Sequence, residues 1–375
     1  MWGKGMCLNQ NAPPRCFTSQ MLQTTLAKIL LAPFSFLYGM GISLRNWFYR
    51  RNLLKGISFN LPVISVGNLS VGGAGKTPHI EYLIRSLDPY LNIATLSRGY
   101  RRKTKGYLQV QPHMNAEQVG DEPLQYKRKF PDVQVTVAEE RAFAIPKIVG
   151  ARPDTQLILL DDAFQHRAVK PGLNILLTEF DRPFTRDYLL PSGRLREWRS
   201  AYARADVIIV TKCPNVLDRA AADALIEEID PLPHQRVFFS YYDYAAPYYM
   251  LDHRYRLQLD KDLDVLLISA IANTDYLLTY LKEKAQSVKS LEYEDHHYFD
   301  RRDLGNLRDR FTAIDSKRKA IITTEKDATR LELHRDFIRK ERLPIFVLPL
   351  AVRFHFEEGM EFDTLIRDFM LNFRA

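Results

Sequence analysis

The stretch from Val63 to Leu87, VISVGNLSVGGAGKTPHIEYLIRSL, decides the fold. It opens with an apolar run, Val63–Val66, that is typical of a buried strand. A glycine-rich turn follows, and then a segment with apolar residues three and four positions apart, as in a helix. A strand, a glycine-rich turn and a helix in this order predict a phosphate-binding loop. The glycines let main-chain N–H groups curl around phosphate oxygens at the positive end of the helix.

Each part of this loop has a chemical task. Lys76 would reach the β- and γ-phosphates of a nucleotide, and the Thr77 hydroxyl would bind Mg²⁺. One position departs from the G-x-x-x-x-G-K-T pattern, because Ser70 stands where the first glycine is expected. The predicted nucleotide-binding residues form one unbroken run: Ser70, Val71, Gly72, Gly73, Ala74, Gly75, Lys76 and Thr77.

A second apolar run, TQLILLDD over residues 155–162, predicts a buried strand that ends in two carboxylates. A parallel sheet would place this strand end beside the phosphate-binding loop, so that Asp161 or Asp162 could hold Mg²⁺ directly or through water. Together, the glycine-rich loop and this strand favour a protein that hydrolyses or transfers a nucleotide phosphate.

The remaining apolar runs predict an α/β protein of the P-loop type, with a largely parallel sheet and helices on both faces. Core strands are expected at residues 62–66, 92–96, 133–137, 156–160, 173–178 and 206–211. A smaller second α/β unit is expected to contain strands near 235–241, 264–269, 319–323 and 344–349. The predicted organisation is a disordered tail over 1–20, an interface helix over 21–55, the core over 56–230, the second unit over 231–357 and a C-terminal helix over 358–375 that folds back on the core.

The composition and net charge of the chain limit the kinds of partner that we expect. With 46% hydrophobic and 26% charged residues in 375, the chain is an ordinary globular protein. Its net charge of +8 suits an anionic partner, whether a phosphate, a nucleic acid or an acidic membrane surface. The three cysteines are too few and too scattered for a disulfide framework or a zinc site.

The N-terminal region contains an uncharged run, ILLAPFSFLYGMGISL, over residues 29–44. It is shorter than the roughly 20 apolar residues of a spanning helix and is interrupted by Pro33, so we predict neither a transmembrane span nor a secretory signal. An apolar face followed by Arg45, Arg50 and Arg51 fits a helix in the lipid interface. A helix packed on the protein's own core fits equally well. The polar start also leaves Met1 and Met21 both open as the natural first residue.

Two kinds of phosphate chemistry compete, a kinase and a GTPase-type switch. Residues 211–214, TKCP, begin like a guanine-recognition motif, but Pro214 stands where an aspartate would bind guanine. Adenine is therefore the favoured base and a kinase the favoured class, with a membrane-recruited nucleotide switch as the alternative.

Taken in order, several further segments complete a pattern: GNLSVGGAGKTP, LSRGYRR, VGDEPL, AEER, LLDDAFQH, LLPSGRLRE, DHH and TTEKDA. With them the chain resembles the tetraacyldisaccharide 4'-kinase family from about Met21 almost to its end. The resemblance implies an ATP- and Mg²⁺-dependent kinase of lipid A biosynthesis that phosphorylates the 4'-hydroxyl of an acylated disaccharide 1-phosphate. It also implies a monomer that binds no nucleic acid and contacts the cytoplasmic face of the bacterial inner membrane peripherally.

The resemblance also assigns roles to individual residues. Asp121 matches the aspartate that activates the acceptor hydroxyl, and His296 matches its histidine partner, with His297 as a second candidate. Lys76 completes the catalytic set, and Ser70 matches the family's own loop. The implied metal residues are Thr77, Asp161, Asp162 and Glu197. The substrate-binding residues predicted from these polar segments are Arg98, Tyr100, Arg101, Gln165, His166 and Arg194. Ala163 departs from the family, which has glycine there.

Overall fold

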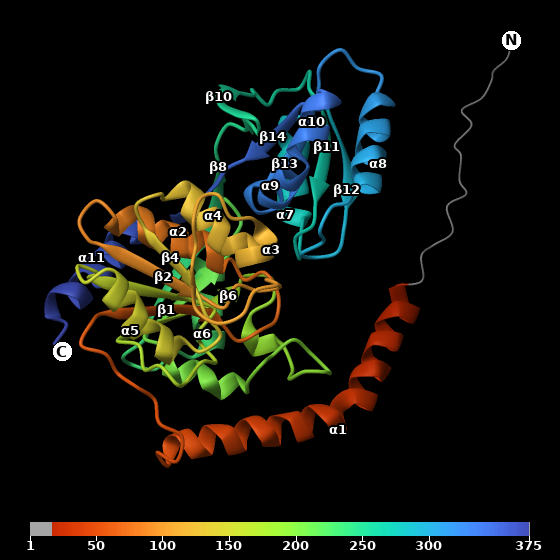
Figure 1. The fold of residues 1–375 in the computed structure, drawn as a ribbon. Coiled ribbons are helices and arrows are strands. Elements are labelled where there is room, and N and C mark those ends of the chain that lie inside the picture. Colours follow the sequence, from red (N-terminus) through yellow and green to blue (C-terminus); the bar gives the residue numbers. More distant parts are fainter. Residues whose placement is uncertain (1–16, 375) are drawn as a thin grey trace, which may run out of the picture.

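The computed structural model describes residues 17–374, with side chains from residue 28 onward; most of the tail predicted over 1–20 lies outside the described residues. Two α/β units lie side by side, and a long helix, α1 (Phe17–Arg50), runs along the larger one (Figure 1). Residues 17–20 belong to α1, so this part of the predicted tail is wrong. No helix within the described part of the chain has the length and apolarity needed to cross a membrane.

The larger unit is built on a nine-stranded sheet with the order β15-β8-β7-β6-β1-β5-β2-β4-β3. Its strands are β1 (Val63–Asn68), β2 (Ile93–Ser97), β3 (Leu108–Gln109), β4 (Gln134–Val137), β5 (Leu157–Asp161), β6 (Leu173–Glu179), β7 (Val207–Thr211), β8 (Arg236–Tyr244) and β15 (Leu350–Phe354). Among the described strands of this sheet, only the two edge pairs, β3 with β4 and β15 with β8, are antiparallel. The predicted largely parallel sheet is therefore confirmed.

Helices cover both faces of this sheet, because side chains that alternate along each strand are buried on either side. Ile64 of β1 packs in a cluster with residues of α2 (Lys76–Leu87), α4 (Asp121–Lys129) and α11 (Glu358–Asn372). Val63 packs on the other side with α5 (Arg141–Ala151), and β7 packs there with α6 (Arg219–Ile229). The short elements α3 (Ala116–Val119), η1 (Phe184–Arg186) and η2 (Arg199–Arg204) lie in the connections.

The smaller unit has a six-stranded sheet with the order β10-β9-β14-β13-β11-β12. Its strands are β9 (Tyr248–Tyr249), β10 (Asp252–Arg256), β11 (Asp264–Ser269), β12 (Ser287–Glu292), β13 (Lys319–Thr324) and β14 (Ile345–Leu348). Its helices are α7 (Asp275–Lys284), α8 (Arg301–Thr312), α9 (Glu325–Leu331), η3 (Glu332–His334) and α10 (Arg335–Lys340). Separate apolar clusters fill its two faces.

One strand lies in the larger unit, although the sequence predicts it in the smaller one. The strand expected at 235–241 is β8, which pairs in parallel with β7 in the larger sheet, so the boundary at residue 231 is wrong. The buried β7 needs a partner on this side, and β8 supplies it. After β14 the chain returns as β15, which pairs with β8 so that Leu350 faces Tyr244. The chain thus crosses between the units at two neighbouring points.

Candidate active site

The phosphate-binding loop joins the carboxyl end of β1 to α2 and lines a cavity of about 330 Å³ between the two units. This volume is that of a small-molecule site. Gly72 has φ 113° and Gly75 has φ 87°, backbone conformations that favour glycine. A Cβ atom on Gly75 would also lie 2.5 Å from the Tyr242 hydroxyl, so the loop could not pass β8 with a larger residue.

The loop residues from Val71 to Thr77 all line this cavity, as the sequence predicts. Ser70 does not: it forms a bridge with Leu195 and borders a separate small cavity behind the loop. The opposite wall of the main cavity comes from the smaller unit and includes Ala272, Tyr276 and Lys326. The site is therefore shared between the two units.

Asp161 ends β5 directly beside β1, because the sheet register places it opposite Val66. It is 1% exposed; Tyr126 donates a hydrogen bond to its Oδ2 at 3.0 Å, and its Oδ1 has no hydrogen-bond partner. Burial raises the pKa of Asp161 to about 7, and the nearby Glu122 carboxylate adds to the effect. An unpartnered, buried carboxylate oxygen next to a phosphate-binding loop fits a Mg²⁺ ligand, which would stabilise its charged form.

Asp162 is held differently, although it is the next residue. Arg196 donates to both of its carboxylate oxygens, at 2.8 and 3.0 Å, and Lys76 Nζ lies 3.6 Å from Oδ1. Burial alone would raise the pKa of Asp162, but Lys76 and Arg196 outweigh it and hold the pKa well below its usual range. Asp162 is therefore a carboxylate. Lys76 also donates to Asn68 Oδ1 at 3.0 Å.

Arg196 lines the cavity, although the sequence pattern does not predict it as a site residue. It also donates to the main-chain carbonyl of Asn68 at 3.1 Å, so it joins Asp162 to the end of β1. The segment LLPSGRLRE contains two arginines, and the sequence pattern predicts a role only for the first. That residue, Arg194, is paired with Asp187 and Glu179 and lies beside the small cavity behind the loop instead.

Glu197 is not placed at the main cavity. It is 1% exposed, and its two carboxylate oxygens accept hydrogen bonds from Arg204 at 2.9 and 3.0 Å and from Asn46 at 3.1 Å. These contacts tie α1 to the segment after Arg196. No group of three or more His, Cys, Asp and Glu side chains in the described residues is arranged to hold a metal by itself.

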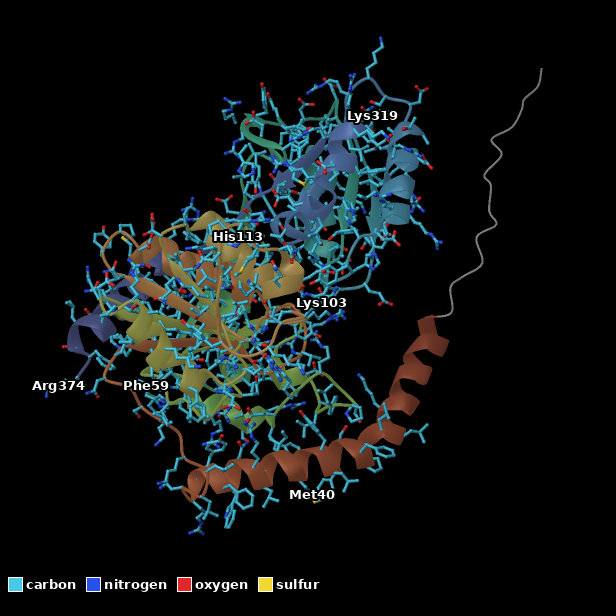
Figure 2. The ribbon with its side chains drawn as sticks, in the orientation of Figure 1. Met40, Phe59, Lys103, His113, Lys319 and Arg374 are labelled. Carbon is cyan, nitrogen blue, oxygen red and sulfur yellow. The ribbon has the colours of Figure 1, made fainter. Side chains whose placement is uncertain are left out.

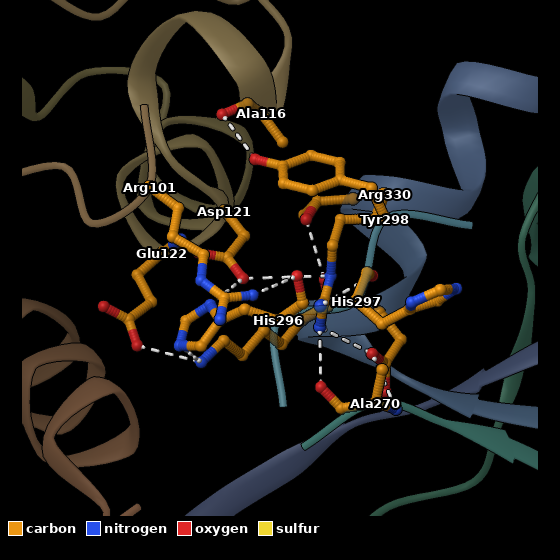
Figure 3. A network of polar contacts seen from close by, with 12 residues as sticks. Arg101, Ala116, Asp121, Glu122, Ala270, His296, His297, Tyr298 and Arg330 are labelled. Atoms are coloured by element: carbon orange, nitrogen blue, oxygen red, sulfur yellow. Dashed lines mark hydrogen bonds and ion pairs between the residues drawn. The ribbon is translucent and has the colours of Figure 1, made fainter. Parts of the chain in front are cut away.

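Asp121 and His296 come together from the two units (Figure 3). His296 Nδ1 lies 3.0 Å from Asp121 Oδ2, and both side chains are largely buried. Asp121 begins α4, after Gly120 with φ 92°, whereas His296 lies in the loop after β12 with φ 60°. His297 points elsewhere: it stacks on Tyr293 and bonds Asp303. The structure thus favours His296 over His297 as the partner of Asp121.

The charge on Asp121 is set by three side chains of the smaller unit. Burial acts to raise the pKa of Asp121, but Lys326, His296 and Arg330 together hold it well below its usual range. Arg330 Nε lies 3.8 Å from Asp121 Oδ2. Asp121 is therefore an anion that the smaller unit stabilises.

Of the residues predicted to bind substrate, Tyr100 and Arg101 lie beside His296, whereas Gln165 contacts Asn68 and His166 lies near Arg141. Tyr100 lines the cavity with its ring 4.8 Å from that of His296, and Arg101 donates to the main-chain carbonyl of His296 at 3.0 Å. Gln165 donates to the Asn68 carbonyl at 2.9 Å. Burial, and then the charges of Arg141, Arg45 and the exposed Arg98, lower the pKa of His166 to about 4.

Known proteins resemble this chain over most of its length. A family model described as tetraacyldisaccharide-1-P 4'-kinase matches residues 27–370. The chain is 39% identical over 345 residues to the tetraacyldisaccharide 4'-kinase of Phocaeicola vulgatus, covering 91% of this chain and 94% of that protein. It is 42% identical over 345 residues to the Parabacteroides distasonis enzyme of the same name, covering 90% and 93%.

Among solved structures, the chain resembles LpxK from Aquifex aeolicus, which was crystallised in complex with ATP. The TM-score is 0.69 at 28% identity, and the likeness covers 92% of this chain and 99% of that one. The resemblance noted in the sequence is therefore confirmed: the chain belongs to the tetraacyldisaccharide-1-P 4'-kinase family.

Proposed function

We propose that this protein transfers the γ-phosphoryl group of ATP to the 4'-hydroxyl of an acylated disaccharide 1-phosphate, a precursor of lipid A. Family membership supports the reaction, and the site is supported by His296, which lines the cavity of the phosphate-binding loop and lies 3.0 Å from the buried Asp121. The position of this pair is the main support for the proposal, because one cleft then provides both a site for the phosphate donor and a group that can activate the hydroxyl.

In this proposal the main-chain N–H groups from Val71 to Thr77 hold the triphosphate. Thr77 and Asp161 would hold Mg²⁺, which supplies neutralisation of phosphate charge when it is bound. Asp162 would stand beside it, kept ionised by Arg196. Lys76 would turn from Asn68 towards the β- and γ-phosphates and stabilise the charge of the transferred group.

Asp121 accepts the proton of the 4'-hydroxyl. The sugar oxygen bonds to the γ-phosphorus while the bond from that phosphorus to the β–γ bridging oxygen breaks, so that ADP leaves. A carboxylate with a depressed pKa is a weak base, but phosphoryl transfer has a loose transition state that asks mainly for positioning and charge stabilisation. His296 donates from Nδ1 to Asp121 and keeps it in place.

The acidic substrate would be recognised by positive and aromatic side chains at the cleft. Tyr100 lines the cavity, and Arg98 is exposed near Arg141 and His166. Arg101 would act indirectly, because its contacts are to the carbonyls of Asp295 and His296.

Helix α1 would bring the cleft to the membrane. Its outward face carries exposed apolar side chains, and Figure 2 shows side chains of α1, Met40 among them, extending away from the larger unit. Basic residues follow, so we propose peripheral contact with the anionic inner face of the bacterial inner membrane. One chain supplies both walls of the cleft, so the reaction needs no second subunit. The domains that we propose for this chain are helix α1, a core that includes β8 and α11, and the smaller unit.

The decisive experiment incubates the protein with γ-labelled ATP and a lipid A disaccharide 1-phosphate in mixed micelles. Label should appear at the 4' position of the lipid, and it should be lost with Asp121→Asn. A nucleotide switch, the alternative, would bind GTP tightly and leave the lipid unlabelled.

A further inference from the structure

The segment TTEKDA and the residues after it contain Lys326 and Arg330, to which the proposed reaction assigns no step. This segment ends β13 and starts α9, and Thr324 caps the helix by accepting a hydrogen bond from the Asp327 N–H at 3.1 Å. Lys326 and Arg330 are four positions apart, so they lie on one face of α9. Both belong to the smaller unit, and both lie near Asp121 of the larger one.

Lys326 reaches the centre of the site. Its Nζ lies 3.2 Å from His296 Nε2 and 3.1 Å from Glu122 Oε1, and it lines the cavity with a side chain that is 20% exposed. Burial acts to lower the pKa of Lys326, but the carboxylates of Glu122, Asp121 and Asp295 raise it well above its usual range. The group is therefore an ammonium, which can only donate hydrogen bonds.

These contacts define where the proton on His296 lies. An ammonium cannot accept a hydrogen bond, so the short contact with Lys326 requires a lone pair on Nε2. A carboxylate can only accept, so the contact with Asp121 requires a proton on Nδ1. Both nitrogens of His296 are thus committed, and neither is available to take a proton from a substrate.

We propose that Lys326 is a positioning residue that keeps Nε2 of His296 unprotonated, so that His296 only orients Asp121 and the acceptor proton goes to Asp121. The inference rests on the proposed phosphoryl transfer to a hydroxyl. A second observation supports it: Arg330 Nε is buried, has no hydrogen-bond partner and lies 3.8 Å from Asp121 Oδ2. Helix α9 therefore directs two cations at the Asp121–His296 pair.

The groups around His296 determine what removing Lys326 would do. Asp121 lies 3.0 Å from Nδ1 and Asp295 Oδ2 lies 3.7 Å from Nε2. The guanidinium of Arg101 donates to main-chain carbonyls and lies over the Tyr100 ring, which packs against His296. In the Lys326→Met variant, His296 would still face the carboxylates of Asp121 and Asp295 but would no longer face an ammonium group. We therefore expect Nε2 to take up a proton at pH 7, which would make His296 a cation. Lys326→Arg keeps a donor that cannot accept, and Nε2 should remain unprotonated.

The test combines nuclear magnetic resonance with kinetics on the full-length protein. In protein labelled with ¹⁵N-histidine, two-bond ¹H–¹⁵N spectra distinguish protonated from unprotonated ring nitrogens, and His296→Gln identifies the signal. We expect an unprotonated Nε2 in the wild-type protein and in Lys326→Arg, and a protonated Nε2 in Lys326→Met. A protonated Nε2 in the wild-type protein, or the same signal in all three proteins, would overturn the inference.

Kinetics then separate positioning from folding. We expect Lys326→Met to lower kcat about 10- to 100-fold, the scale on which outer partners of a functional group act, with little change in KM for ATP. Lys326→Arg should recover part of kcat, and Lys340→Met, an exposed lysine on α10, should change nothing. Equal losses in the Met and Arg variants would contradict the positioning role. The resonance experiment needs no turnover, so it can fail or succeed even if the wild-type protein does not label the lipid.

Discussion

The Tyr38 hydroxyl of α1 donates to the main-chain carbonyl of Arg196 at 3.0 Å, and the guanidinium of this same Arg196 holds both carboxylate oxygens of Asp162. The segment around Arg196 also bonds the phosphate-binding loop, from the Arg196 N–H to the Leu69 carbonyl and from the Val71 N–H to the Arg194 carbonyl, both at 2.7 Å. It is thus sandwiched between α1 and the nucleotide site. The position of α1 should therefore affect the site.

Two glycines of α1 provide a matched test of this contact. A Cβ on Gly39 would lie 2.3 Å from Trp198 Cζ2, whereas a Cβ on Gly41 would meet nothing within 4 Å. We expect Gly39→Leu to cost about 1–3 kcal/mol in the free energy of unfolding, as overpacking does, and to lower kcat/KM. Gly41→Leu should leave both unchanged. Thermal melts and steady-state kinetics measure the two effects, and equal behaviour of the two variants would argue against coupling.

Asp121→Asn keeps the size of the side chain but removes its ability to accept a proton. We expect kcat to fall about 10²- to 10⁴-fold, since this is the usual contribution of a general base. Asp336→Asn, at an exposed position of α10, serves as the control. A variant at Asp121 with near-normal turnover would exclude it as the acceptor.

The two arginines of LLPSGRLRE should differ in importance. Arg196→Met removes the bidentate contact to Asp162, and we expect a loss of about 10- to 100-fold in kcat. Arg194→Met breaks pairs with Asp187 and Glu179 outside the main cavity and should have a smaller effect. Kinetics of the two variants at saturating ATP decide the point, and the reverse order would favour Arg194 as the more important arginine.

A buried ionic cluster predicts a pH dependence of stability. Lys129 lies 2.6 Å from Glu81 and 2.8 Å from Glu325, so one ammonium serves two carboxylates. Burial raises the pKa of Glu81 to about 7 from an ordinary value of 4.5, with Glu325 adding to the effect and Lys129 opposing it.

The sign of this dependence follows from proton binding. Between about pH 4.5 and 7 the folded protein holds a proton on Glu81 that the unfolded chain has released, so this group's contribution to the free energy of unfolding falls as pH rises. Glu81→Gln removes the titration. We expect its stability, measured by chemical denaturation at pH 5, 6, 7 and 8, to rise relative to the wild-type protein as pH increases. A constant difference would contradict the raised pKa.

Membrane contact can be tested on the outward face of α1. Leu30, Phe34 and Leu37 are each more than half exposed. Replacing all three with Glu should greatly weaken flotation with vesicles that contain phosphatidylglycerol, because apolar burial and lipid attraction are both lost. Leu371→Glu changes a 76% exposed residue on α11 and should have no effect. Unchanged flotation of the triple variant would favour another surface.

The parts of the site that could be predicted are those that a local pattern encodes. The loop after β1 and the carboxylates after β5 follow from strand, glycine and charge patterns, and the register of the sheet brings them together. The pairing of Asp121 with His296 came from the family resemblance alone, because 175 residues separate them in the chain.

What could not be predicted depends on contacts between distant segments. The strand pattern of β8 is the same whichever sheet it joins, and only its pairing with β7 and β15 places it in the core. Arg196 and Lys326 look like any other arginine or lysine in the sequence. Their roles arise from groups on neighbouring elements, Asp162 for one and His296 for the other.

The smaller unit departs from the core after β8 and rejoins it at β15, where Tyr244 and Leu350 are direct partners. Topologically it is an insertion in a β-hairpin, attached at one place by two adjacent strands. This inserted unit supplies His296, Lys326 and Arg330. The cleft is thus divided along the chain: the larger unit supplies the phosphate-binding loop and Asp121, and the inserted unit supplies the side chains that face Asp121.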